Sequence, residues 1–205
     1  MEYKCNIGIK MENTKKNKMD LKKIEEGVKL ILEGVGEDPD SGRLENTPHR
    51  VAEMFAEILD GTHKDPDDFL KALTEEKHEE MVILKDIPIY SMCEHHLLPF
   101  SGIASVVYIP KKGKIMGLNT IALLVDSLAK RLQIQERLTK QVADYLVKAL
   151  SPLGVMVVIK AEHLCMSMRG AKKPGARTIT SAVRGIFRDN LASREEAMSL
   201  IMAKD

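Results

Sequence analysis

The chain has 205 residues, of which 44% are hydrophobic and 30% charged, and its formal net charge is +1. This size and composition are typical of one globular domain, or of a domain with a helical extension. The near-zero charge, the aromatic content of 4% and the lack of tryptophan give no indication of a nucleic-acid or anionic-membrane partner. No apolar run is long enough to span a bilayer, and the polar N-terminus does not resemble a signal peptide.

The first part of the chain is predicted to be helical. Residues 1–19 are polar and rich in Lys and Asn, and we expect a mobile tail there. Residues 20–79 are predicted to form an N-terminal helical region, whose first helix starts at Asp20. A second helix follows Thr47, which we expect to be its N-cap, and a short third helix is expected over "PDDFLKAL".

The pattern changes to strands near residue 81. The runs "MVILKDIPIYS" and "FSGIASVVYIP" predict two strands, and apolar stripes that include Leu128, Leu132 and Leu138 predict two helices after them. Two more strands, "VMVVIKAEHLCMSMR" and "RTITSAVRGIF", and a final helix from about Ser193 complete the chain. We therefore predict an α+β domain with an antiparallel sheet over residues 80–205.

Two separated segments carry potential metal ligands. In "SMCEHHLLP", Cys93 and His96 stand three residues apart on a predicted turn, so both can reach one ion. In the strand near residue 165, alternate residues share a face. His163, Cys165, Ser167 and Arg169 are therefore expected to project together. Cys165 could then supply a third ligand.

Two thiolates and one imidazole suit Zn²⁺, and three protein ligands leave a fourth position for water, as in catalytic sites. His95 and His163 would remain as proton shuttles. Two alternatives stay open: the thiols are ordinary buried side chains, or a spare histidine completes a closed structural site. Three cysteines form no disulfide framework, which favours reduced thiols and a cytoplasmic location, with Cys5 an incidental exposed thiol.

Four motifs resemble the GTP cyclohydrolase I family: "TPHRVA", "SMCEHHLLPFSG", "RLQIQERLT" and "AEHLCMSMRG". The resemblance extends over about residues 20–190. It implies the tunnelling fold, in which subunit sheets join into a barrel and rings stack into a homodecamer with active sites at subunit interfaces. It also implies zinc on Cys93, His96 and Cys165, with His95 and His163 moving protons. The implied reaction is hydrolysis of GTP at C8 of guanine, which releases formate and forms 7,8-dihydroneopterin triphosphate for folate and pterin biosynthesis.

The resemblance also implies a set of substrate contacts. Glu136 matches the guanine anchor, because a carboxylate accepts from both N1–H and the 2-amino group of guanine. Gln135 beside it is a weaker candidate, and Arg50 and Arg169 match arginines directed at the triphosphate. Without the resemblance, Glu136 reads as an exposed acid in the first turn of a helix, and Arg50 as part of a solvated helix face.

One segment departs from the family pattern. Where the family usually has serine, lysine and, three residues later, arginine, "GLNTIALLV" has Asn119, Thr120 and Leu123. Asn119 stands where the resemblance implies a serine that contacts the ribose, so we expect it to contact the substrate and to be the N-cap of a helix. Two phosphate-binding cations are nevertheless missing. Lys172, Lys173 and Arg177 could compensate. Alternatives to GTP hydrolysis are action on a less phosphorylated guanine nucleotide, arrest at the ring-opened product, or a non-catalytic zinc-binding scaffold.

Overall fold

The computed structural model describes residues 19–203, apart from 71–72 and 76–77, and the expected mobile tail with Cys5 lies almost entirely outside the described residues. The helices are α1 (Leu21–Gly34), α2 (Thr47–Ile58), α3 (Leu118–Ala129), α4 (Gln135–Leu150), α5 (Leu164–Ser167), α6 (Ile186–Asp189) and α7 (Leu191–Met202), with 3-10 turns η1 (Asp60–His63) and η2 (Pro66–Asp68). The strands are β1 (Leu73–Glu75), β2 (Val82–Cys93), β3 (Pro99–Ile109), β4 (Lys114–Met116), β5 (Leu132–Gln133), β6 (Gly154–His163) and β7 (Arg177–Gly185). This mixture confirms the predicted α+β class.

A five-stranded sheet in the order β5-β2-β3-β6-β7 forms the centre of the molecule. The four long strands pair antiparallel, as predicted. The short strand β5 pairs parallel to the end of β2 through Met92 and Cys93, so the sheet is mixed rather than purely antiparallel. Leu132, which we expected on a helical stripe, belongs to β5 and is 42% exposed.

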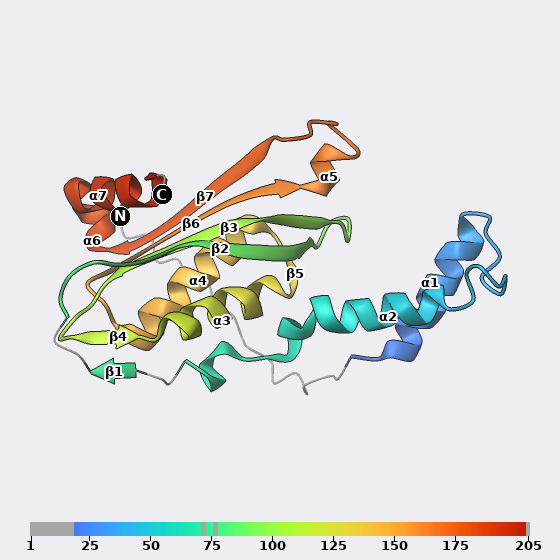
Figure 1. Ribbon diagram of the computed structural model, residues 1–205, viewed down its shortest axis with the longest axis horizontal. Helices are drawn as coiled ribbons and strands as arrows, with labels where there is room; N and C mark the ends of the chain where they lie inside the picture. Colours follow the sequence, from blue (N-terminus) through green and yellow to red (C-terminus); the bar gives the residue numbers. More distant parts are fainter. Residues whose placement is uncertain (1–18, 71–72, 76–77, 204–205) are drawn as a thin grey trace, which may run out of the picture.

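Helices α3 and α4 cover one face of the sheet, and α6 and α7 cover one end of the other face (Figure 1). Alternation along β3 explains this arrangement, because side chains at successive positions point to opposite faces. Phe100, Ala104, Val106 and Tyr108 face α3 and α4 and are buried in the main core. Val107 faces the other way and packs with Phe187 of α6 and Ala197 of α7.

Helices α1 and α2 form a hairpin that extends away from the sheet (Figure 1). A hydrogen bond of 2.9 Å between Nδ1 of His49 and a carboxylate oxygen of Glu25 links the two helices. No residue of α1 is buried, and Leu30 and Ile31 are 68% and 64% exposed. The hairpin therefore has apolar surface that the described residues do not cover.

Several local predictions need correction. The N-cap of α2 is Asn46 rather than Thr47, and the N-cap of α3 is Gly117 rather than Asn119. Among the described residues of the expected third helix, only the single turn η2 is helical, and Leu73 belongs to β1. Residues 20–79 also contain β1, which pairs with β4, so this region is not wholly helical. The final helix starts at residue 191, two residues earlier than expected.

Candidate metal centre and substrate pocket

The turn between β2 and β3 places the first two candidate metal ligands. Cys93 ends β2 and is 5% exposed, because β5 covers it from one side. Its N–H donates to the carbonyl of Leu98, and its carbonyl accepts from the N–H of Leu97, so residues 93–98 form a closed turn. Leu97 has a φ of 50°, a left-handed backbone conformation that residues other than glycine rarely adopt. This turn brings His96 back beside Cys93.

The third candidate ligand, Cys165, lies on a helical turn and not on a strand. The ladder between β3 and β6 ends at the pair Phe100–His163, and the next residue of β3 is Pro99, which has no N–H to donate. Residues after His163 therefore satisfy their backbone groups locally, and the N–H of Met168 donates to the carbonyl of Leu164. The expectation that residues 163, 165, 167 and 169 share a strand face is wrong.

The structure nevertheless brings the three predicted ligands together. One ligand atom from each of Cys93, His96 and Cys165 lies within 4.8 Å of the others. Ligands of a tetrahedral ion at zinc-like bond lengths stand roughly 3.5–4 Å apart, so a small side-chain movement accommodates an ion. Burial raises the pKa of the Cys165 thiol, and the neighbouring Cys93 thiol adds to the rise. Since two adjacent thiolates repel each other, this donor set suits a bound cation.

Both predicted proton-transfer histidines lie beside this cluster. Nδ1 of His95 is 3.9 Å from Sγ of Cys93, and the His95 side chain is 63% exposed. His163 is partly buried, and its ring stacks on Phe100 with 4.6 Å between the ring centroids. Burial lowers the pKa of His163, while the charge of Glu136 acts in the opposite direction. The neutral, basic form of His163 is therefore favoured near neutral pH.

An ion pair that the sequence analysis missed connects the metal-ligand turn to α4. Two nitrogens of Arg137 donate to the two carboxylate oxygens of Glu94 at 2.6 and 2.9 Å. These hydrogen bonds lower the pKa of Glu94. Both residues lie within the motifs that supplied the predicted site. The position of the Glu94 carboxylate between two candidate metal ligands was the sequence feature that could have indicated this ion pair. The pair fixes the turn relative to the start of α4.

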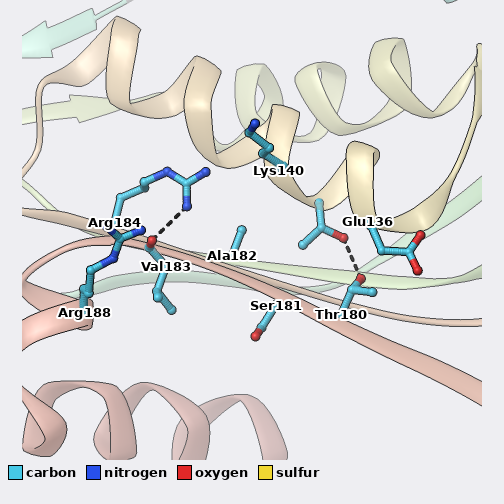
Figure 2. A pocket seen from close by; sticks show the side chains of 9 residues that line it. Glu136, Lys140, Thr180, Ser181, Ala182, Val183, Arg184 and Arg188 are labelled. Carbon is cyan, nitrogen blue, oxygen red and sulfur yellow. Dashed lines mark hydrogen bonds between the residues drawn. The ribbon is translucent and has the colours of Figure 1, made fainter. Parts of the chain in front are cut away.

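The first two residues of α4 point in different directions. Gln135 is 1% exposed and makes hydrogen bonds to β6 and β7. Glu136 is exposed and lines a cavity of about 410 Å³ between α4 and β7. Figure 2 shows Glu136 and Thr180 at one end of this cavity, Arg184 and Arg188 at the other, and Lys140 between the two ends. The cavity thus combines a carboxylate with hydroxyl groups and three basic side chains.

The segment from the end of β6 through α5 and the following loop places charged side chains near the candidate metal ligands. A guanidinium nitrogen of Arg169 donates to Nε2 of His96 at 3.0 Å. Glu162, at the end of β6, accepts from the hydroxyl of Ser167 at 2.7 Å and from the N–H of Gly175 at 3.0 Å. These two hydrogen bonds close the loop that carries Arg169, and they lower the pKa of Glu162.

Two predicted substrate contacts do not meet the cluster within one chain. Arg50 is exposed on α2, in the hairpin that extends away from the sheet (Figure 1), and its side chain makes no hydrogen bond or ion pair with another described residue. Asn119 is exposed at the start of α3, near β4, whereas α3 ends near β5 and Cys93. The 12 residues of α3 are about 18 Å long, so this helix start lies well away from the metal cluster.

A family model for GTP cyclohydrolase I matches residues 24–202. The chain belongs to the GTP cyclohydrolase I family. Proteins named GTP cyclohydrolase 1 are similar over nearly their whole length. That of Desulforamulus reducens is 61% identical over 89% of this chain and 98% of its own. That of Thermoanaerobacter pseudethanolicus is 58% identical over 91% of this chain and 99% of its own. That of Clostridioides difficile is 57% identical over 92% of this chain and 100% of its own.

Family membership confirms the resemblance that the four motifs indicated. Among solved structures, the apo form of the archaeosine synthase QueF-Like matches 53% of this chain and 97% of its own, with 25% identity and a TM-score of 0.45. None of the described helices reaches the length and apolarity that crossing a bilayer requires.

Proposed function

We propose that this protein hydrolyses GTP at C8 of the guanine ring, releasing formate and forming 7,8-dihydroneopterin triphosphate. The observation that carries the proposal is the convergence of Cys93, His96 and Cys165, with His163 beside them, in a member of the GTP cyclohydrolase I family. The reaction balances with one water molecule. Opening the imidazole ring and releasing formate consume two water molecules, and closure of the rearranged ribose onto the amine releases one.

Cys93, His96 and Cys165 would hold Zn²⁺, to which two thiolates and an imidazole are well matched. When bound, such an ion supplies Lewis acidity that makes water nucleophilic near neutral pH. The partly buried His163, favoured in its neutral form, would accept and return protons at the reacting atoms. His95, exposed on the same turn, would be the second proton carrier.

Glu136 would recognise the base from the cavity of Figure 2. An ionised carboxylate accepts two hydrogen bonds, which matches N1–H and the 2-amino group of guanine and rejects adenine, whose N1 is an acceptor. Arg169 would contact the phosphates, since it lies beside His96 on an exposed loop that also carries Lys172 and Lys173.

A ring of subunits would complete the site. Strand β7 has no partner on its outer side among the described strands, and β2 is paired on its outer side only at residues 92–93. Joining β7 of one chain to β2 of the next is a head-to-tail contact, which closes into a ring. Neighbouring chains could then bring Arg50 and the start of α3 to the cluster, and the exposed α1–α2 hairpin could join two rings into a decamer.

A formate-release assay with GTP, GDP, GMP, guanosine and ATP tests the proposal directly. GTP should release formate, and ATP should not. The variant Cys165→Ser should lose both bound zinc, measured by elemental analysis, and formate release, because a hydroxyl is a poor substitute for a thiolate. Full zinc content in that variant would remove Cys165 from the ligand set, and no formate from any guanine compound would refute the activity.

A second candidate function is the same ring opening on a guanine nucleotide with fewer phosphates. It is favoured by one observation: the start of α3 presents Leu118 and Leu123, which are 56% and 48% exposed, and no cation. The same assay separates the candidates by the ratio of kcat/KM for GTP and GMP.

A further inference from the structure

The side chain of Gln135 is held in a single orientation by its surroundings. It starts α4, and it is 1% exposed beneath β6 and β7. Its Nε2 lies 3.0 Å from the carbonyl oxygen of Ile159 and 3.1 Å from that of Thr178. It also lies 3.1 Å from Oγ1 of Thr180. Carbonyl oxygens only accept hydrogen bonds, so the amide nitrogen must face them and the amide cannot be reversed.

This orientation decides which nitrogen of His163 carries a proton. Oε1 of Gln135 lies 2.8 Å from Nε2 of His163. Because an amide oxygen has no hydrogen to donate, Nε2–H must be the donor. A neutral imidazole has one N–H, so its lone pair is then on Nδ1. The ring plane is fixed as well, since Phe100 stacks on it at an interplanar angle of 14°.

We infer that Gln135 is a positioning residue: it holds His163 as the Nε2–H tautomer and leaves Nδ1 as the ring nitrogen that exchanges protons during the reaction. This inference deepens the proposed function and rests on it for the role of His163. It differs from the expectation that Gln135 contacts the substrate. Both N–H groups of its amide are already engaged, and its side chain has almost no exposed surface with which to reach a ligand.

The hydrogen bonds around Gln135 extend to the cavity that we assign to the guanine base. Oγ1 of Thr139 lies 2.6 Å from Oγ1 of Thr180 and donates to the backbone carbonyl of Gln135 at 2.7 Å. Thr139 and Thr180 also line the cavity, next to Glu136 (Figure 2). Two consecutive residues at the start of α4 therefore have different roles. Glu136 faces the cavity, and Gln135 faces inward to the histidine.

Steady-state kinetics of formate release distinguish positioning from substrate contact. The variant Gln135→Leu keeps the size of the side chain and removes its polar groups. If Gln135 positions His163, kcat should fall by about 10²-fold, with KM changed no more than about threefold, because misplacement of a reacting group acts on the chemical step. A rise in KM of tenfold or more with kcat preserved would overturn the inference.

A second glutamine on the same helix provides the matched control. Gln141 of α4 is partly buried and accepts a hydrogen bond from Gln133 at 2.8 Å, and it makes no hydrogen bond to a histidine among the described residues. Gln141→Leu should therefore leave kcat within about threefold of the unaltered protein. An equal loss of kcat in both variants would attribute the effect to a general disturbance of α4 and would overturn the inference.

The tautomer can be measured without any activity, so this arm separates failure of the inference from failure of the proposed function. Solid-state NMR of the metal-loaded protein with ¹⁵N-labelled histidine, at about pH 8 and so above the ordinary imidazole pKa, resolves protonated from unprotonated ring nitrogens. Subtracting the spectrum of His163→Gln identifies the signals of His163. We expect a protonated Nε2 and an unprotonated Nδ1. The opposite tautomer in the unaltered protein would refute the inference, even if Gln135→Leu fails to fold or no substrate is turned over.

Discussion

The start of α3 provides the sharpest test of substrate preference. The resemblance described in the sequence analysis implies lysine and arginine where this chain has Thr120 and Leu123, and Leu123 is 48% exposed with nothing charged to offer a phosphate. The double variant Thr120→Lys, Leu123→Arg places two cations three residues apart on the helix, at a partly exposed and an exposed position. If a neighbouring subunit brings this helix start to the substrate, both can reach the phosphates.

A hydrogen bond between a charged group and its partner contributes about 1.5–3 kcal/mol. Two such bonds amount to about 3–6 kcal/mol, and every 1.4 kcal/mol is a factor of ten. The ratio of kcat/KM for GTP to that for GMP should therefore rise by about 10²- to 10⁴-fold in the double variant. Cations at a helix N-terminus oppose the helix dipole by about 0.3–1 kcal/mol each, so the thermal midpoint should fall slightly.

Formate release from GTP and GMP measures this ratio in each protein. The matched control is Ser199→Lys, Leu200→Arg, which adds the same two cations to α7, where Leu200 is also 48% exposed. The control ratio should stay within about threefold of the unaltered protein. If the unaltered protein already prefers GTP over GMP by more than about a thousandfold, the missing cations are compensated elsewhere and the reasoning is refuted.

Three further outcomes are expected. His163→Ala and His95→Ala should each keep their zinc and lose about 10²- to 10⁴-fold in kcat, the range for a positioned acid or base; zinc loss in either variant would make that histidine a ligand. Glu136→Gln should raise KM for GTP by tenfold or more, because an amide cannot accept both donors of guanine, and an unchanged KM would remove Glu136 as the anchor. Hydrogen bonds depress the folded-state pKa of Glu162 below the ordinary value for a glutamate, so its stabilising contribution is fully present above the unfolded pKa and is lost as pH falls through the folded one. The difference in thermal midpoint between the unaltered protein and Glu162→Gln should accordingly be largest near neutral pH and shrink as the pH falls through the folded-state pKa; a difference independent of pH would contradict this assignment.

The sequence alone determined the features that depend on local patterns. The runs "MVILKDIPIYS" and "FSGIASVVYIP" predicted β2 and β3, and helical periodicity predicted α3 and α4. Donor chemistry selected Cys93 and His96 as candidate ligands, because both belong to one short turn. These inferences needed only neighbours in the chain, so they hold in any fold that keeps the local conformation.

Other features follow from contacts between segments far apart in the chain, and only the tertiary structure decided them. Cys165 reaches the cluster from a helical turn because the ladder of β6 ends where Pro99 has no N–H to donate, and the alternation pattern contains no sign of that missing partner. Gln135 and Glu136 are equally polar neighbours in the sequence. Packing of α4 against β6 and β7 buries the first against His163 and leaves the second in the cavity, because a helix turns successive side chains by about 100°.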